Sequence, residues 1–140
     1  MIKKVTTEDE MGRISEIWLE SNIETHDFIA ADYWKSHLAE VKQLMIEAEI
    51  YAVYEEEQPV AFIGLVGNYI AGIFILKDYQ KKGYGKKLLK VAQQKYSELH
   101  LSVYEKNQNA VAFYKYQNFI IIEQKMDENN EVEYLMVWTK

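Results

Sequence analysis

Gln80-Lys81-Lys82-Gly83-Tyr84-Gly85 joins an apolar run, Ile70 to Leu76, to an amphipathic run that starts at Lys86. This order predicts a strand, a glycine-bearing turn and a helix. The first turn of a helix has backbone N–H groups without partners, and its dipole adds partial positive charge. Glycine lets the backbone approach a ligand closely. The stretch therefore predicts a site for a phosphate or pyrophosphate group.

Two common phosphate-binding motifs do not fit this loop. The spacing G-x-x-x-x-G-K-[ST] of a Walker loop is absent, and the dinucleotide pattern G-x-G-x-x-G fails because Leu88 stands at its third glycine. The remaining pattern, Q-x-x-G-x-G after a buried strand, resembles the acetyl-coenzyme A loop of the GNAT superfamily of N-acetyltransferases, [RQ]-x-x-G-x-[GA]. The alternative for this motif alone is an ordinary strand-to-helix turn that requires glycine.

Length and composition limit the class of protein. A chain of 140 residues with 49% hydrophobic residues suits one domain with one sizeable core. The net charge of −6 argues against a nucleic-acid binder and is compatible with a cationic substrate. Cysteine is absent, which excludes disulfides, thiolate nucleophiles and Cys-ligated zinc. We expect a cytoplasmic protein, because neither a signal peptide nor an 18-residue apolar run is present.

Hydrophobic periodicity predicts an alternation of strands and helices along the whole chain. A capping-box pattern at residues 7–10 predicts the start of the first helix, and the polar residues 22–27 predict its end. The middle strands, joined by tight turns, should be antiparallel, and the strand–helix–strand crossover at 69–104 should be parallel. We thus expect an α/β (α+β) fold: a mixed, mostly antiparallel sheet with helices on both faces. The predicted strands are 1–6, 50–54, 60–66, 69–76, 99–104, 119–125 and 132–138, and the predicted helices are 7–21, 30–48, 86–96 and 107–116.

A second motif follows the predicted strand 99–104. The stretch from Val103 to Tyr114 contains Asn107-Gln-Asn-Ala110-Val-Ala-Phe113-Tyr114, which is similar to the N-x-x-A-x-x-[FL]-Y pattern of the same superfamily. Asn118 stands where the family usually has glycine, and asparagine tolerates the left-handed conformation of a helix end. The stretches 21–34 and 133–138 resemble a bacterial subgroup of small, single-domain GNAT enzymes. The element order also matches the GNAT order, so the resemblance covers nearly the whole chain and implies that the parallel central pair of strands is splayed.

The resemblance implies acetyl-CoA as acetyl donor, without a metal. The pantetheine arm would bond the backbone of the strand before the loop, and the pyrophosphate would bind loop amides. Asn107 would also touch the cofactor, although helix N-capping is its alternative role. The cofactor-binding residues expected on this basis are Ile73, Phe74, Ile75, Gln80, Lys81, Lys82, Gly83, Tyr84, Gly85, Lys86 and Asn107.

Tyr114 matches the family tyrosine that protonates the leaving thiolate, and its alternative role is a core aromatic. No carboxylate stands on the strand before the loop, where many family members carry a general base, so Glu105, Glu133 and His26 are the candidates. The acceptor pocket is expected between residues 22–34 and the hairpin 126–134, with His26, Phe28 and Trp34 as substrate-binding candidates. Helix packing is the alternative role of Trp34.

The sequence is therefore interpreted as a direct-transfer N-acetyltransferase acting on a primary amine in a ternary complex. Two alternatives remain: transfer of a longer acyl group, and a non-catalytic module that binds acetyl-CoA and acts through a partner protein. The acceptor amine belongs to a small molecule or a protein, and no nucleic-acid or membrane partner is expected. A homodimer is compatible with the 11 Tyr and 3 Trp residues.

Overall fold

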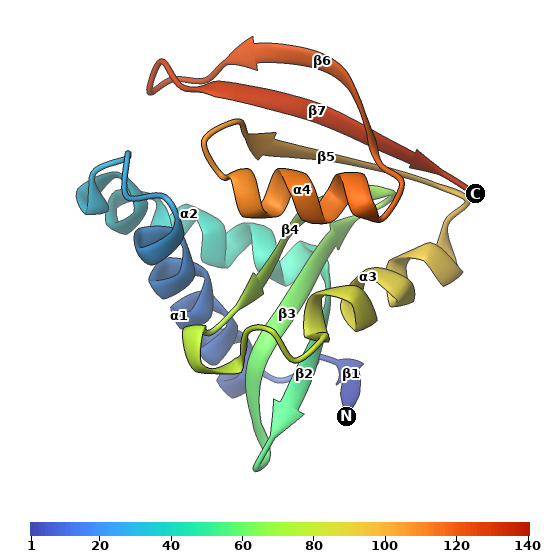
Figure 1. Cartoon of the computed structure of the whole chain (residues 1–140). Helices are drawn as coiled ribbons and strands as arrows, with labels where there is room; N and C mark the ends of the chain where they lie inside the picture. Colours follow the sequence, from blue (N-terminus) through green and yellow to red (C-terminus); the bar gives the residue numbers. More distant parts are fainter.

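Seven strands form one twisted sheet in the computed structural model, which describes residues 1–140 (Figure 1). The strand order is β1-β2-β3-β4-β5-β7-β6, and only β4 and β5 pair in parallel. The expected mixed, mostly antiparallel sheet is confirmed. The strands are β1 (Ile2–Lys4), β2 (Glu49–Glu55), β3 (Gln58–Val66), β4 (Tyr69–Ile75), β5 (Glu98–Tyr104), β6 (Ile120–Met126) and β7 (Val132–Thr139).

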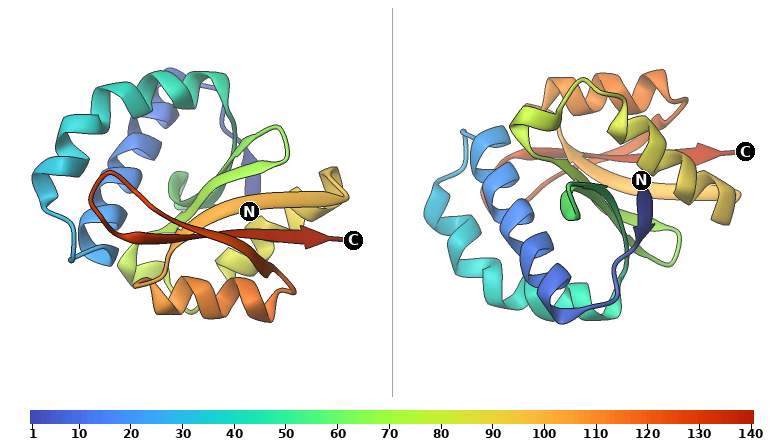
Figure 2. Two further views of the ribbon diagram at one scale, coloured as in Figure 1. Left: turned by 90° about the horizontal axis from the view of Figure 1, so that it is seen from above. Right: turned by 90° about the horizontal axis from the view of Figure 1, so that it is seen from below.

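Helices cover both faces of this sheet (Figure 2). None of the helices combines the length and the hydrophobicity that crossing a membrane requires. The helices are α1 (Glu8–Thr25), α2 (Ala31–Glu47), α3 (Tyr84–Lys95) and α4 (Gln108–Tyr116), and a short 3₁₀ helix, η1 (Lys77–Tyr79), follows β4.

Helix α1 begins where the capping box predicts, because the Thr7 side chain accepts a hydrogen bond from the Glu10 amide. The prediction that residues 22–27 break this helix is wrong for its first four residues, since α1 continues to Thr25. The reason is a local hydrogen bond: the Asn22 side chain donates to the Trp18 carbonyl at 2.9 Å. A buried asparagine that is satisfied in this way no longer competes with the helix.

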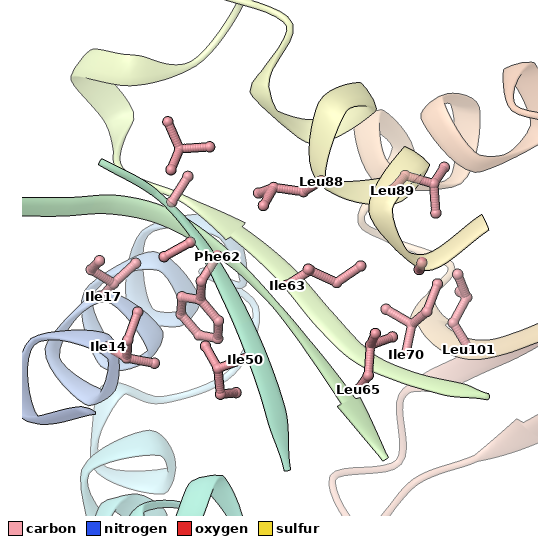
Figure 3. Close-up of a cluster of buried hydrophobic side chains, with 14 of the residues drawn as sticks. Ile14, Ile17, Ile50, Phe62, Ile63, Leu65, Ile70, Leu88, Leu89 and Leu101 are labelled. Atoms are coloured by element: carbon pink, nitrogen blue, oxygen red, sulfur yellow. The ribbon is translucent and has the colours of Figure 1, made fainter. Parts of the chain in front are cut away.

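The hydrophobic core is one cluster of 25 buried residues that lie on both faces of the sheet (Figure 3). Phe62 packs with Ile14 and Ile17 of α1, whereas Ile63 faces Leu88 of α3. Strand β3 is buried over seven consecutive residues because helices cover both of its faces. Alternate side chains of such a strand enter different layers, which explains its continuous hydrophobic sequence.

Strands β4 and β5 separate soon after they begin. They pair only at Tyr69–His100 and Ile70–Leu101. On the other side of β4, the register with β3 shifts between Gly64 and Leu65, which leaves Ala71 as an extra residue. Such a bulge bends a strand. The backbone of β4 beyond Ile70 consequently has no strand partner on the side that faces β5.

The turn after α4 contains Asn118 in the left-handed conformation, with φ of 71°. The Phe119 amide donates to the Tyr114 carbonyl at 2.9 Å and closes the helix end. We predict that Asn118→Ala destabilises the fold by about 1–2 kcal/mol, since alanine bears the left-handed penalty, whereas Asn118→Gly does not. Urea unfolding of both variants measures this, and an alanine variant as stable as the native chain would contradict it.

Candidate active site

The loop between β4 and α3 presents a row of free amides. The N–H groups of residues 81–86 donate to no backbone carbonyl, and the first helical bond of α3 is Lys87 to Gly83 at 3.2 Å. Helix α3 starts at Tyr84, two residues earlier than predicted, with Gly83 as its N-cap. The Gln80 side chain donates to the Ile75 carbonyl at 3.1 Å and fixes the beginning of the loop to the end of β4. These amides and the helix dipole suit an anion.

Glycine is needed at the two loop positions for different physical reasons. Gly83 adopts φ of 83°, a conformation that side chains disfavour. Gly85 lies inside the helix, and a Cβ there would lie 3.5 Å from the side chains of Ile75 and Phe113, an ordinary contact distance. Gly83 therefore shapes the turn, while Gly85 leaves space between β4 and α4. Lys81 also has a positive φ, of 64°, although it is not glycine.

An apolar cavity of about 300 Å³ lies beside this loop. It is lined by the unpaired part of β4, by α4 and by the loop, including Lys81 and Lys86. Apolar walls, an unpaired strand edge, free backbone N–H groups and two lysine amines fit a long arm that ends in phosphates, such as that of an acyl-CoA. The lining residues are Ile73, Ile75, Lys81, Gly83, Tyr84, Gly85, Lys86, Ala110, Phe113 and Tyr114.

Two of the expected cofactor residues have side chains elsewhere. The Phe74 ring packs on the Phe62 ring, with centroids 5.0 Å apart, so only its backbone borders the unpaired edge. The Lys82 amine lies 3.9 Å from the Glu55 carboxylate and 5.2 Å above the Tyr79 ring, outside the cavity lining. The Tyr84 hydroxyl also donates to Glu55. Glu55, at the end of β2, thus holds the outer side of the loop.

Tyr114 lines the cavity from α4 and is 7% exposed. Its ring contacts Phe113 and Phe119, with centroid distances of 5.2 and 5.4 Å. Burial raises the pKa of its hydroxyl above the ordinary value, so the phenol keeps its proton at neutral pH. The structure shows the core packing that was the alternative role of Tyr114 and places its hydroxyl beside the cavity, while its role as the acid stays a prediction.

Asn107 faces a second, polar cleft of about 630 Å³. Asn107 and Tyr114 therefore line two different cavities, although they stand at the N-cap and near the end of the same helix. The polar cleft lies between the end of α1, η1 and the start of α4. Its lining residues are Glu24, Thr25, Lys77, Gln80, Lys106, Asn107, Gln108 and Asn109.

A chain of hydrogen bonds links Asn107 to α1 through His26. The Asn22 amide group donates to the Trp18 carbonyl, so its oxygen accepts from His26 Nδ1 at 3.0 Å. His26 Nε2 then accepts from Asn107 Nδ2 at 3.3 Å, while the Asn107 oxygen accepts from the Ala110 amide. Every donor meets an acceptor in this arrangement. Asn107 is thus an N-cap of α4, and His26 fixes the orientation of its amide.

Burial lowers the pKa of His26 from 6.5 to about 4. Because the folded pKa lies below the unfolded one, stability is complete above pH 6.5 and decreases as the pH falls from 6.5 towards 4. The loss should reach about 2–3 kcal/mol.

We predict that His26→Gln weakens this pH dependence, since glutamine does not titrate. Urea unfolding at pH 7.5 and pH 5 measures the change in the free energy of unfolding between the two pH values. His100→Gln, on β5, is the control. A loss between these pH values that is equal in the native chain and in His26→Gln would refute the role of His26.

The region predicted to bind the acceptor is assembled from distant segments. The rings of Phe28, His26 and Tyr104 contact one another, with centroid distances of 5.1 to 5.6 Å. The Tyr104 hydroxyl donates to Asp127 at 2.5 Å, and the Tyr33 hydroxyl donates to Glu128. The α1–α2 connection and the β6–β7 hairpin therefore meet at the end of β5, as expected.

Trp34 lines neither of the two cavities, and its role in acceptor binding stays a prediction. It is 8% exposed and packs against Trp18 of α1, at 5.8 Å, and against His26, at 5.4 Å. This position matches helix packing, the alternative that the sequence left open. Tyr104 and Asp127 complete the region instead, and the sequence alone did not single them out, because their proximity depends on the pairing of β5 with β7.

Of the candidate bases, Glu133 has the most suitable surroundings. It is half-buried on β7 and opposes Tyr104 across the β5–β7 pair. Burial raises the pKa of its carboxyl, Asp127 adds to this, and Lys125 opposes it. Glu105 instead accepts a hydrogen bond from the Tyr134 hydroxyl at 2.7 Å. A carboxylate with a raised pKa is the better proton acceptor near neutral pH.

Comparison with known proteins gives the same assignment as the geometry. Residues 12–119 match the family model described as the acetyltransferase (GNAT) family. The chain is 33% identical over 132 residues to the peptidyl-lysine N-acetyltransferase YiaC of Escherichia coli K12, covering 92% of this chain and 90% of that protein. It is 36% identical over 112 residues to the peptidyl-lysine N-acetyltransferase YjaB of the same organism, covering 79% and 76%.

Solved structures agree with the sequence comparison. The solution structure of apo-form YjaB from Escherichia coli superimposes with a TM-score of 0.84 at 29% identity, covering 99% of this chain and 96% of that one. An acetyltransferase from Bacillus anthracis, solved in complex with acetyl coenzyme A, has a TM-score of 0.61 at 24% identity, covering 67% and 64%. Because the family model matches residues 12–119 and both relatives are more than 30% identical over most of the chain, this chain belongs to the GNAT family and is an N-acetyltransferase.

Proposed function

We propose that this chain transfers the acetyl group of acetyl-CoA directly to the side-chain amine of a lysine in a peptide or protein. The observation that carries the proposal is the apolar cavity between the unpaired part of β4 and the buried Tyr114, which ends at the free amides of the loop. The lysine acceptor is supported by the names of the relatives YiaC and YjaB. A chain without cysteine suits direct transfer in a ternary complex, which needs no covalent enzyme intermediate.

Acetyl-CoA supplies an activated acetyl group as a thioester. The backbone of β4 at Ile73 and Ile75 would pair with the pantetheine arm as an added strand. The amides of residues 81–86 and the amines of Lys81 and Lys86 would hold the pyrophosphate. Gln80 keeps the loop on β4, and Asn107 borders the adjoining polar cleft.

The chain's own groups would move two protons. Tyr114 donates its phenolic proton to the departing thiolate, because burial keeps the hydroxyl protonated. Glu133 accepts a proton from the acceptor amine, directly or through water, since its raised pKa makes it a better base than an ordinary carboxylate. The acidic side chains around it also favour the approach of a cationic lysine.

We predict a specific pH profile for Glu133→Gln. In the native chain, log kcat/KM against pH should have a slope of about 1 where only the acceptor amine is protonated, and about 2 below the pKa of Glu133. Glu133→Gln should lower kcat by about 10²-fold and remove the change of slope. The profile with a lysine peptide measures both effects. A steeper limb that persists in the variant would exclude Glu133 as the base.

Release of free thiol tests the function itself. The full-length chain is incubated with acetyl-CoA and a panel of amines: lysine peptides, peptide N-termini, polyamines and aminoglycosides. We expect steady thiol release with lysine peptides, and acetyl-lysine in the product by mass spectrometry. Butyryl-CoA in the same assay tests the longer-acyl alternative. A faster reaction with another amine class would overturn the lysine assignment.

A second function is favoured by one observation, the absence of a carboxylate in residues 68–72 of the strand that precedes the loop. In this case the chain would bind acetyl-CoA without turnover and act through a partner protein. Calorimetric titration with acetyl-CoA, performed beside the thiol assay, distinguishes the two functions. Tight binding without thiol release for any amine would support the binding module.

A further inference from the structure

Lys106 is the lysine whose amine reaches the predicted acceptor region. Its Nζ lies 3.0 Å from Glu131 Oε1 and 5.3 Å from the centroid of the Phe28 ring. Lys106 itself stands in the connection between β5 and α4, directly before Asn107. An ammonium between an aromatic face and a carboxylate is held by cation–π attraction and by a charge-assisted hydrogen bond. The chain thus places one of its own primary amines beside a proposed substrate-binding residue.

Glu131 is a fixed partner for this amine. Its side chain is 16% exposed, the lowest value among the carboxylates that form ion pairs in the structure. Its backbone is held by Asp127, because the Glu131 amide donates to Asp127 Oδ1 at 3.0 Å and the Glu131 carbonyl accepts from the Asp127 amide at 2.9 Å. The hairpin therefore keeps the Glu131 carboxylate in place, whereas the Lys106 side chain is 57% exposed.

We propose that Lys106 is an intramolecular acceptor: the enzyme acetylates this side chain itself. The inference rests on the proposed function and adds a modification site to it. Lys106 lines the polar cleft together with Asn107 and Gln80, the residue that begins the acetyl-CoA loop. Its flexible four-carbon stem lets the amine turn from Glu131 into this cleft. A tethered nucleophile needs no separate binding step, so Lys106 reacts when no other acceptor is bound.

The step is a balanced acyl transfer. Glu131 takes the proton that the Lys106 ammonium loses, and the neutral nitrogen forms a bond to the acetyl carbon. The bond between that carbon and sulfur breaks, and the thiolate takes a proton from Tyr114. The nitrogen then loses its second proton, which returns to the Tyr114 phenolate, and Glu131 releases the first proton to solvent. The products are N-acetyl-Lys106, coenzyme A and one proton released to solvent. Acetylation removes the positive charge of Lys106, so its ion pair with Glu131 is lost.

Peptide mapping by mass spectrometry tests the site. The full-length chain is incubated with acetyl-CoA alone, and acetyl-Lys106 is followed over time at several protein concentrations. We expect Lys106 to be acetylated at least about tenfold faster than Lys77, because Lys106 is held near the acceptor region. Lys77 is the comparison because it lines the same cleft but forms no ion pair and no cation–π contact. The rate constant should not depend on protein concentration, as an intramolecular reaction requires.

Two variants and one control make the result decisive. Glu131→Gln should slow acetylation of Lys106 by about 10²-fold, since the proton acceptor is lost. Lys106→Arg should remove that acetyl group and leave the slow labelling of the other lysines unchanged. The chain unfolded in urea gives the purely chemical rate, at which Lys106 and Lys77 should be equivalent.

The failure of this inference is separable from the failure of the proposed function. Turnover of added lysine peptides without faster labelling of Lys106 would overturn self-acetylation alone. A rate constant that rises with protein concentration would also overturn it, since the modification would then be intermolecular. If no amine causes thiol release and no acetyl-Lys106 forms, both proposals are overturned together.

Discussion

Replacing Tyr114 with phenylalanine is expected to lower kcat by about 10²-fold or more, the usual effect of losing a positioned acid. The ring remains and keeps its contacts with Phe113 and Phe119, while the only proton donor of the side chain disappears. The hydroxyl forms no hydrogen bond within the protein, so its loss leaves no buried group unsatisfied. Affinity for acetyl-CoA and Tm should therefore hardly change. Steady-state kinetics, calorimetric titration and thermal unfolding of one variant measure all three quantities.

Tyr116→Phe is the matched control for this experiment. Tyr116 lies on the same helix two residues later and is 83% exposed, so the same chemical change there should leave kcat unaltered. If kcat of Tyr114→Phe equals the native value and stability falls instead, Tyr114 is only a core aromatic. The direction of the two changes thus distinguishes the alternatives that the sequence left open.

Gly85→Val is expected to weaken acetyl-CoA binding by roughly 10-fold to 100-fold. The Cβ itself would fit, at 3.5 Å from Ile75 and Phe113, but the two γ-methyl groups of valine enter the space between β4 and α4. Overfilling a packed site costs about 1–3 kcal/mol, and each 1.4 kcal/mol corresponds to tenfold in affinity. Calorimetric titration with acetyl-CoA measures the loss, and circular dichroism verifies that the variant is folded.

Gly85→Ala provides the control, since it adds only the carbon that the space accepts and should bind acetyl-CoA nearly as the native chain does. Gly83→Val tests the other glycine, because its φ of 83° makes a β-branched residue strained there. It should reduce both binding and stability. Unchanged affinity in both valine variants would remove the pyrophosphate site from residues 80–86.

The sequence by itself determined the element order, the fold class and the family. These features depend on local patterns: period-2 and period-3.6 hydrophobicity, the capping box at Thr7, and two short motifs at fixed positions. The loop amides were predictable for the same reason, because a glycine turn before an amphipathic helix exposes them wherever the helix packs. Asn118 was also predictable, since the backbone at a helix end favours residues that tolerate positive φ, and its φ of 71° confirms this.

Only the tertiary structure decided which side chains meet. The hydrogen-bond chain from Asn22 through His26 to Asn107 joins two helices that are distant in sequence, and it also keeps residues 22–25 helical. The pairing of β5 with β7 brings Glu133 opposite Tyr104, which changes the pKa of its carboxyl through burial. The contact of Lys106 with Glu131 spans 25 residues. Burial, pKa and long-range contacts depend on distances between segments, and these distances are fixed only when the strands have paired in the folded sheet.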